Sequence, residues 1–285
     1  MRSERIVGCA VTVLALVVSS LGCSISVDSS RVQCTTTADC TVRGGAFAGS
    51  VCSSDHVCQT DPTWACLLTK RQPSSQPAPF TVTIGRIIDV VSFESVPGAT
   101  ARLCRKLDVA CELPLSSQSV DPATGVTFSI DANFTGYVEV TVPGFQTTLY
   151  FFNPPVDRNL TVPMVTVAST LAYTSLLGAL GTAPSTTRGT IIVMSTDCLN
   201  NPAAGISYST PDGDAQSKSF YYVNGLPSAS ATATDSAGYG GLTNLLAGAV
   251  TFNARQVSTG INFTPISLVV RGGALSFTQM VPFSN

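Results

Sequence analysis

The sequence predicts an all-β protein in which two antiparallel β-sandwiches follow a small disulfide-rich N-terminal module. Thr, Ser, Val, Gly and Pro are abundant, and short apolar or alternating runs recur between turn residues, as in sandwiches and barrels. Ten cysteines in 285 residues indicate an oxidising compartment and a disulfide framework.

Charge and hydropathy argue against a nucleic-acid partner and against a membrane-spanning helix after residue 22. The net charge is -2 and only 11% of residues are charged, whereas nucleic-acid binding needs a basic face. No apolar stretch after residue 22 reaches the roughly 18–20 residues that span a bilayer. We therefore expect no nucleic-acid partner, and no membrane-spanning helix beyond the N-terminal stretch.

Residues 1–22 are typical of a signal peptide. Arg2 and Arg5 precede the apolar run from Ile6 to Val18, and small residues then lead to Cys23. This stretch resembles a bacterial lipobox, which implies a lipid on the Cys23 thiol and attachment to the outer membrane or cell surface. The order Ser20-Leu21 departs from that pattern. An ordinary secretory signal, giving a secreted or periplasmic protein, therefore stays as the alternative.

Eight cysteines remain once Cys9 and Cys23 are set aside, an even number that suits complete pairing. These disulfide candidates are Cys34, Cys40, Cys52, Cys58, Cys66, Cys104, Cys111 and Cys198. We expect a tether over 23–33, followed by a module over 34–66. The module has few apolar residues, so disulfides must stabilise it. Its repeated spacing suggests the pairs Cys34–Cys52 and Cys40–Cys58, although four cysteines allow three connectivities.

The remaining cysteines suggest one local and one long-range bridge. Cys104 and Cys111 bracket a short loop and could pair with each other. Cys66 and Cys198 would then tie the module to the later domains. No metal site is predicted, because the cysteines lack the C-x2-4-C spacing of zinc sites and His56 is the only histidine.

The cysteine-rich module resembles short modules near the N-termini of many myxobacterial lipoproteins. The residues that carry this likeness are Cys34, Asp39, Cys40, Gly49, Cys52 and Cys58. The motif brings no chemistry of its own. A Pro/Ser-rich run then predicts a linker over 67–79.

Two stretches, 80–167 and 188–285, repeat one order of strands and turns. Each has a Pro-containing turn followed by an Asp-x-x-Gly type turn: Pro97-Gly98 and Asp121–Gly125 first, then Pro202–Gly205 and Asp235–Gly238. Both stretches look like the carboxypeptidase regulatory-like domain, which implies a transthyretin-like sandwich of about seven strands. The residues that carry the resemblance are Gly85, Pro97, Gly98, Ala99, Asp121, Gly125, Gly136, Tyr137, Gly189, Pro202, Ala203, Gly205, Asp235, Gly238 and Gly248.

The segment 168–187 between the two stretches predicts a linker with a short helix over Leu171 to Leu180. Leucines and alanines recur on neighbouring turns there, and Pro184 ends the pattern. A packing helix is the expected structure.

Catalytic chemistry is not expected. A Ser-His-acid triad is improbable with one histidine in the module, and His56 is not part of an H-x-x-E zinc motif. Asp212 and Asp214 could serve as acid and base or bind Ca²⁺, but Pro-Asp-Gly first predicts a turn. We expect no enzyme activity and no cofactor.

Two aromatic triplets, 150–152 and 220–222, could present a sugar-stacking face or pack in a core, and alternation favours the core. The sequence as a whole predicts a lipid-anchored exported protein with a structural or adhesive role. The alternative is a carbohydrate-binding module protein of the cell surface. The expected partners are the membrane, through the anchor, and a glycan or another surface protein.

Overall fold

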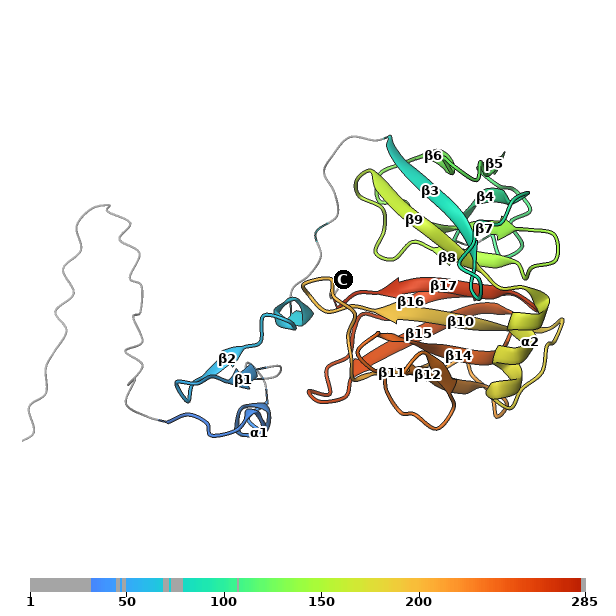
Figure 1. Cartoon of the computed structure of the whole chain (residues 1–285). Coiled ribbons are helices and arrows are strands. Elements are labelled where there is room, and N and C mark those ends of the chain that lie inside the picture. Colours follow the sequence, from blue (N-terminus) through green and yellow to red (C-terminus); the bar gives the residue numbers. More distant parts are fainter. Residues whose placement is uncertain are drawn as a thin grey trace, which may run out of the picture. The chain divides into compact units, whose positions relative to one another are not determined.

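The computed structural model describes residues 32–44, 47, 50–68, 72, 79–106 and 108–282 (Figure 1). The signal peptide, Cys23 and nearly all of the tether lie outside the described residues. From Gln33 onward the chain forms one compact unit. Within the described ranges, no helix is both long and apolar enough to cross a bilayer.

The protein is mostly β. The N-terminal module holds the α-helix α1 (Thr37–Thr41), the strands β1 (Ser50–Cys52) and β2 (Cys58–Thr60) and the 3-10 helix η2 (Ala65–Leu68). The first half contains β3 (Phe80–Asp89), β4 (Thr100–Arg105), β5 (Ser116–Ser119), β6 (Val126–Ile130), β7 (Gly136–Thr141), β8 (Thr148–Phe151) and β9 (Leu160–Val167). The helix α2 (Thr170–Ala179) precedes β10 (Arg188–Ser195), β11 (Ile206–Ser209), β12 (Lys218–Val223), β13 (Leu226–Ser228), β14 (Tyr239–Leu246), β15 (Gly248–Gln256), β16 (Ile266–Val270) and β17 (Leu275–Met280).

The two halves repeat one strand arrangement. In the first half, β3 lies between β6, which is antiparallel to it, and β9, which is parallel. In the second half, β10 lies between the antiparallel β14 and the parallel β17. Each half thus pairs its first strand with its last strand, and the repeated turn pattern of the sequence corresponds to a repeated topology.

One nine-stranded sheet runs through both halves. Its order is β13-β12-β14-β10-β17-β8-β7-β4-β5, and three-stranded sheets β6-β3-β9 and β11-β15-β16 complete the fold (Figure 1). The halves join where β17 pairs in parallel with β8, from Leu275↔Thr148 to Phe277↔Tyr150. The sequence predicts two sandwiches, and the structure adds that they share a sheet, so neither β17 nor β8 is left as an open edge.

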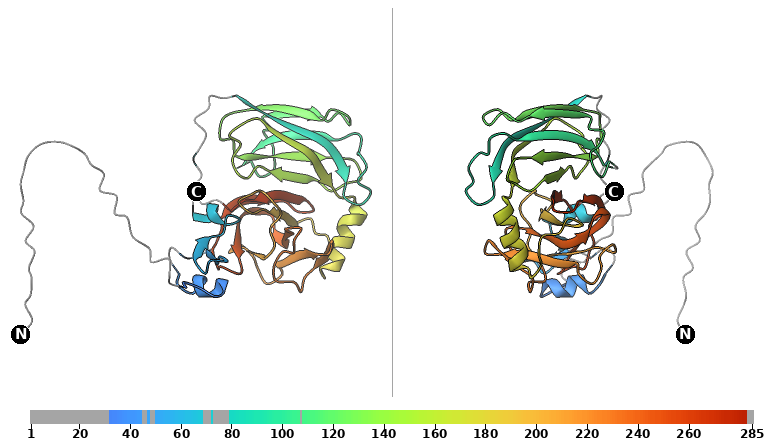
Figure 2. Two further views of the ribbon diagram at one scale, coloured as in Figure 1. Left: turned by 60° about the vertical axis from the view of Figure 1, so that its left-hand side comes forward. Right: turned by 90° about the vertical axis from the view of Figure 1, so that its right-hand side faces the viewer.

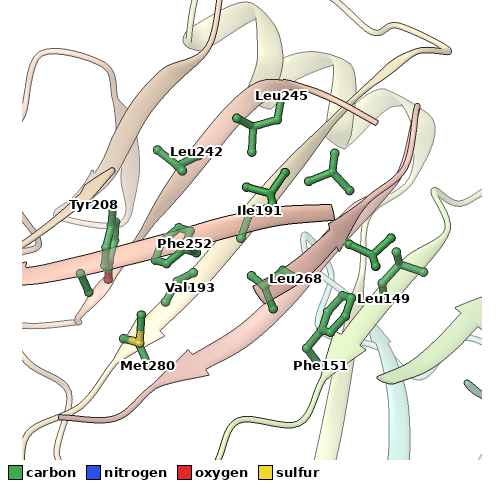
Figure 3. Packing of buried hydrophobic residues seen from close by; sticks show 14 of the residues in the cluster. Leu149, Phe151, Ile191, Val193, Tyr208, Leu242, Leu245, Phe252, Leu268 and Met280 are labelled. Carbon is green, nitrogen blue, oxygen red and sulfur yellow. The ribbon is translucent and has the colours of Figure 1, made fainter. Parts of the chain in front are cut away.

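Strand β8 contributes to two cores because its side chains alternate between the faces of the shared sheet. Leu149 and Phe151 belong to the core of the second half, where Phe151 lies near Leu268 (Figure 3). Tyr150 and Phe152 belong to the core of the first half. The two cores therefore lie on opposite faces of the one sheet.

The turn residues of the repeat hold tight backbone conformations. Gly125 and Gly238 have φ values of +77° and +74°, where a side chain would be strained. A Cβ on Gly125 would also overlap the carbonyl oxygen of Ile84. The Asp121 carboxylate accepts hydrogen bonds from the amides of Ala123 (2.8 Å) and Thr124 (2.7 Å), as expected for such a turn.

Helix α2 forms where the sequence predicts a helix. The Ser169 hydroxyl accepts a hydrogen bond from the Ala172 amide (3.2 Å), which caps the first turn. At the other end, the Lys218 ammonium donates to the carbonyl oxygens of Leu180 (3.3 Å) and Gly181 (3.0 Å). A basic group at a helix C-terminus is favourable for the helix dipole. The helix packs on the shared sheet beside the strands of the second half (Figure 2).

Candidate functional site

An apolar groove of about 700 Å³ lies beside α2 and is here called the α2 groove. Three parts of the chain line it: the loop after β3, the segment from β9 through α2, and the shared sheet. The lining residues are Asp89, Val90, Val91, Ser92, Thr166, Val167, Ala168, Ser169, Leu171, Ala172, Tyr173, Ser175, Leu176, Ala179, Ile192, Tyr222, Pro227, Leu275 and Phe277.

The floor of the α2 groove is the face of the shared sheet that points away from the second core. Ile192 pairs with Phe277 in register across β10 and β17, so the two side chains lie side by side on this face. Tyr222 also lines the groove, and burial raises the pKa of its hydroxyl to about 12. The floor is therefore apolar and contains both aliphatic and aromatic side chains.

Polar groups at the α2 groove mostly bond within the protein. The Asp89 carboxylate accepts from the amides of Val91 (2.6 Å) and Ser92 (3.0 Å). The Ser169 hydroxyl caps α2, and the Tyr173 hydroxyl shares a hydrogen bond with Thr190 Oγ1 (3.3 Å). These groups shape the walls and are not directed at a ligand.

Large apolar side chains are exposed at the mouth of the groove. Val91 is 69% exposed and Leu171 is 77% exposed, and both line the groove. Leu226, next to the lining residue Pro227, is 71% exposed. Apolar groups gathered around a depression are typical of a binding surface.

A second site, the Glu139 cluster, holds the halves together by charge. Glu139 is 1% exposed, and its carboxylate pairs with the guanidinium groups of Arg102 and Arg271. Arg102 is its cross-strand neighbour, whereas Arg271 comes from the turn before β17. Arg271 also donates to the Tyr137 hydroxyl (2.7 Å) and to the Val109 carbonyl (2.5 Å). This cluster ties the Arg271 side chain of the second half to side chains and backbone of the first half, and its role is structural.

The eight cysteines predicted to pair form four disulfides. The pairs are Cys34–Cys52, Cys40–Cys58, Cys66–Cys198 and Cys104–Cys111. These are the connections that the spacing suggests. The sulfurs of Cys34, Cys40 and Cys58 lie within 4.8 Å of one another because two bridges are neighbours, and bridged sulfurs are not thiolate ligands.

The module is attached to the second half by more than the Cys66–Cys198 bridge. The Cys198 amide donates to the Thr63 carbonyl (2.9 Å). Trp64 packs against Phe263, with ring centroids 6.1 Å apart, at the edge of the second core. The lone histidine has a local role, since His56 Nδ1 bonds the Cys34 carbonyl oxygen (3.0 Å).

The acidic pair also has a structural role. Asp214 pairs with Arg188 (2.5 Å), which holds the pKa of that carboxyl far below its usual range. The Asp212 carboxylate accepts from the Thr251 amide (2.6 Å). Both carboxylates are thus engaged in fixing the turn that the Pro-Asp-Gly motif predicts.

The aromatic triplets are largely core. Phe151, Phe152, Phe220 and Tyr221 are buried, and only Tyr150 and Tyr222 are half-buried. The alternation of side chains along the strands predicts this burial in the core. Tyr222 reaches the α2 groove through that alternation, because Phe220 and Tyr222 share one face of β12.

Sequence reasoning did not find the α2 groove or the Glu139 cluster. The groove forms where the loop after β3, helix α2 and the shared sheet meet, and these segments are far apart in sequence, so no local pattern contains it. For the cluster a signal existed, since a single carboxylate stands in the apolar strand β7. A charge at such a position needs a buried partner.

No protein-family model matches the sequence, and no curated protein matches it. Three solved structures with some likeness are the Bacillus anthracis TIE protein, a Streptococcal ancillary pilin and BcpA, the major pilin subunit of Bacillus cereus. The first has 11% identity and a TM-score of 0.25, covering 72% of this chain and 33% of that chain. The chain thus spans about a third of the TIE protein chain. The ancillary pilin has 12% identity and a TM-score of 0.23, and the match covers 72% of this chain and 68% of that chain. BcpA has 9% identity and a TM-score of 0.22, and the match covers 68% of this chain and 69% of that chain. TM-scores this low do not establish a shared fold.

Proposed function

We propose that this chain is an exported, non-catalytic protein with a structural or adhesive role at the cell surface. In this proposal a lipid on Cys23 holds it to the outer membrane. Its two halves are carboxypeptidase regulatory-like sandwiches that serve as one stiff spacer. The partners are the membrane, through the anchor, and a surface protein or glycan.

The observation that carries the proposal is the continuous sheet across both halves. Three links join the parts of the chain. The β17–β8 pairing and the Glu139 cluster join the first half to the second half, and the Cys66–Cys198 bridge joins the module to the second half. Strands, ion pairs and a disulfide that cross between parts oppose their separation, which suits a structural role at a surface. Disulfides persist in oxidising compartments, which supports export.

Enzyme activity is not part of the proposal. The residues that the sequence marks as possible catalytic groups are engaged in structural bonds: His56 with Cys34, Asp214 with Arg188 and Asp212 with Thr251. A general base needs access to a substrate proton, and these groups bond within the fold.

Mass spectrometry of the mature N-terminus tests the anchor. The proposal predicts that the mature protein begins with an acylated Cys23 and that it is recovered in the membrane fraction. The Cys23→Ser variant should lose the acyl mass. An unmodified N-terminus in the wild-type protein would contradict the anchor.

Adhesion is tested with cells that display the full chain. The proposal predicts that displaying cells bind to neighbouring cells or to a coated surface more than cells displaying nothing. Binding to a glycan array by the purified full chain, abolished by Tyr222→Ala, would instead support the carbohydrate-binding alternative. Turnover of a substrate that survives His56→Ala would overturn the non-catalytic proposal.

A further inference from the structure

We propose that the α2 groove binds a single acyl chain of a lipid or fatty acid. Its volume of 700 Å³ falls inside the range of about 300–1,000 Å³ that is usual for small-molecule sites. Its floor and walls are aliphatic and aromatic side chains from three separate parts of the chain. An acyl chain gains free energy there simply by leaving water.

The charges at the groove indicate that the part of the ligand on its floor is uncharged. Asp89 is the one charged residue among the described residues that line the groove, and its carboxylate is held by two backbone amides of its own loop. The lining has no Lys or Arg side chain to pair with a phosphate or carboxylate. A head group would therefore lie at the mouth, in water, with the apolar chain on the floor.

A glycan fits the lining less well than an acyl chain. Sugar hydroxyls need directional partners, because a buried polar group without a hydrogen bond is costly. Here the Ser169 and Tyr173 hydroxyls bond to Ala172 and Thr190. No Asn, Gln, His or Trp side chain is among the described lining residues.

A peptide strand fits less well for a similar reason. A peptide brings amide and carbonyl groups that need partners, usually from a strand edge. At the groove, the Val167 carbonyl already accepts from the Val90 amide (2.9 Å), and the Ala168 carbonyl accepts from the Gln146 amide (2.8 Å). The lining residue of β13 is Pro227, which has no amide hydrogen to donate.

The exposed rim supports the same occupant. Val91 and Leu171, 69% and 77% exposed, extend apolar contact beyond the floor toward the solvent. An acyl chain longer than the floor would cover part of this surface. Tyr222 and Phe277 would contact the methylene groups with their ring faces and edges.

The test uses residues 24–285, which include the whole compact unit, purified without detergent, so that neither an acyl group on Cys23 nor the apolar run from Ile6 to Val18 can enter the groove. Fluorescent cis-parinaric acid and its methyl ester are titrated into it. The proposal predicts saturable binding at one site per chain, by acid and ester alike, with displacement by palmitate stronger than by octanoate. Mass spectrometry of an organic extract of the protein identifies any lipid that copurifies and must first be removed.

Three variants locate the site. Ser175→Trp places a large ring in the groove from an exposed position of α2, and Leu171→Asp places a charge at its mouth near the helix N-terminus, where an acidic group suits the helix. Each should weaken binding by about tenfold or more. Thr174→Trp, a neighbouring exposed position outside the lining, should bind as the parent does.

Several outcomes would overturn the inference: no saturable binding, equal affinity for Ser175→Trp and Thr174→Trp, or displacement by oligosaccharides but not by palmitate. Circular dichroism spectra identical to the parent establish that each variant is folded. All arms lack the Cys23 anchor, so a negative result here says nothing against the anchor or the surface role.

Discussion

Glu139 shows how one residue joins the two halves. Its carboxylate is buried at 1% exposure between Arg102 of the same half and Arg271 of the other half. If one of the two arginines is removed, the buried carboxylate still carries the cost of its desolvation, but it loses part of the ion pairing that offsets this cost.

We therefore predict that Arg271→Ala lowers the free energy of unfolding by about 2–4 kcal/mol, with Arg102 retaining part of the pairing. The matched control is Arg158→Ala, which removes an ion pair to Asp157 from a side chain that is 80% exposed. That change should cost about 0–1 kcal/mol. Urea unfolding of both variants measures the difference, and equal losses would refute the role assigned to the cluster.

Gly125 tests the turn chemistry of the repeat. It shares a positive φ with Gly144 (+77° and +83°), but an added Cβ meets the backbone of Ile84 and Gly85 only at Gly125. Gly144→Ala should cost about 1 kcal/mol from φ strain alone, and Gly125→Ala about 1–3 kcal/mol more, because backbone must shift. Denaturation midpoints at a common m-value provide the comparison. Similar losses for both variants would mean that the turn relaxes freely.

At the scale of elements, one covalent bridge joins the N-terminal module to the second half. Cys66–Cys198 joins residues 132 apart in sequence, whereas Cys104–Cys111 closes a separation of 7. Noncovalent contacts add to the bridge: Trp64 packs on Phe263, and Leu67 is buried in the core of the second half.

Replacing Cys66 and Cys198 together by Ala should free the module for proteolytic removal while the later strands stay folded. The Cys104→Ala/Cys111→Ala variant, which leaves the long bridge intact, should keep the module protected. Limited trypsin digestion followed by intact mass measurement reports the released fragment. A module that stays equally resistant in both variants would show that packing alone holds it.

The sequence predicted elements well where the signal is local. Gly125, Gly238 and the Asp residues of their turns mark the repeat, and the spacing of leucines and alanines marks α2. The spacing and the even number of cysteines suggested the disulfide pairs, but they left other connectivities open, which only the structure distinguishes. The β17–β8 pairing was not predicted, because a parallel contact between residues 275 and 148 leaves no period in either strand. The α2 groove escaped for the same reason, since it depends on distances between elements.

At the scale of the molecule, the shared sheet predicts that the halves unfold together. Separating them would expose Leu149 and Phe151 of β8, which are buried in the core of the second half. It would also break the β17–β8 ladder and leave Glu139 without Arg271. A half that opened alone would therefore lose much of its own support.

Differential scanning calorimetry of the full chain tests this central claim most directly. We predict a single transition in which the calorimetric enthalpy equals the van't Hoff enthalpy, as for a two-state unit. Arg271→Ala should shift that transition to lower temperature without splitting it. Two resolved transitions in the wild-type chain, or a calorimetric enthalpy close to twice the van't Hoff value, would contradict a single fused unit.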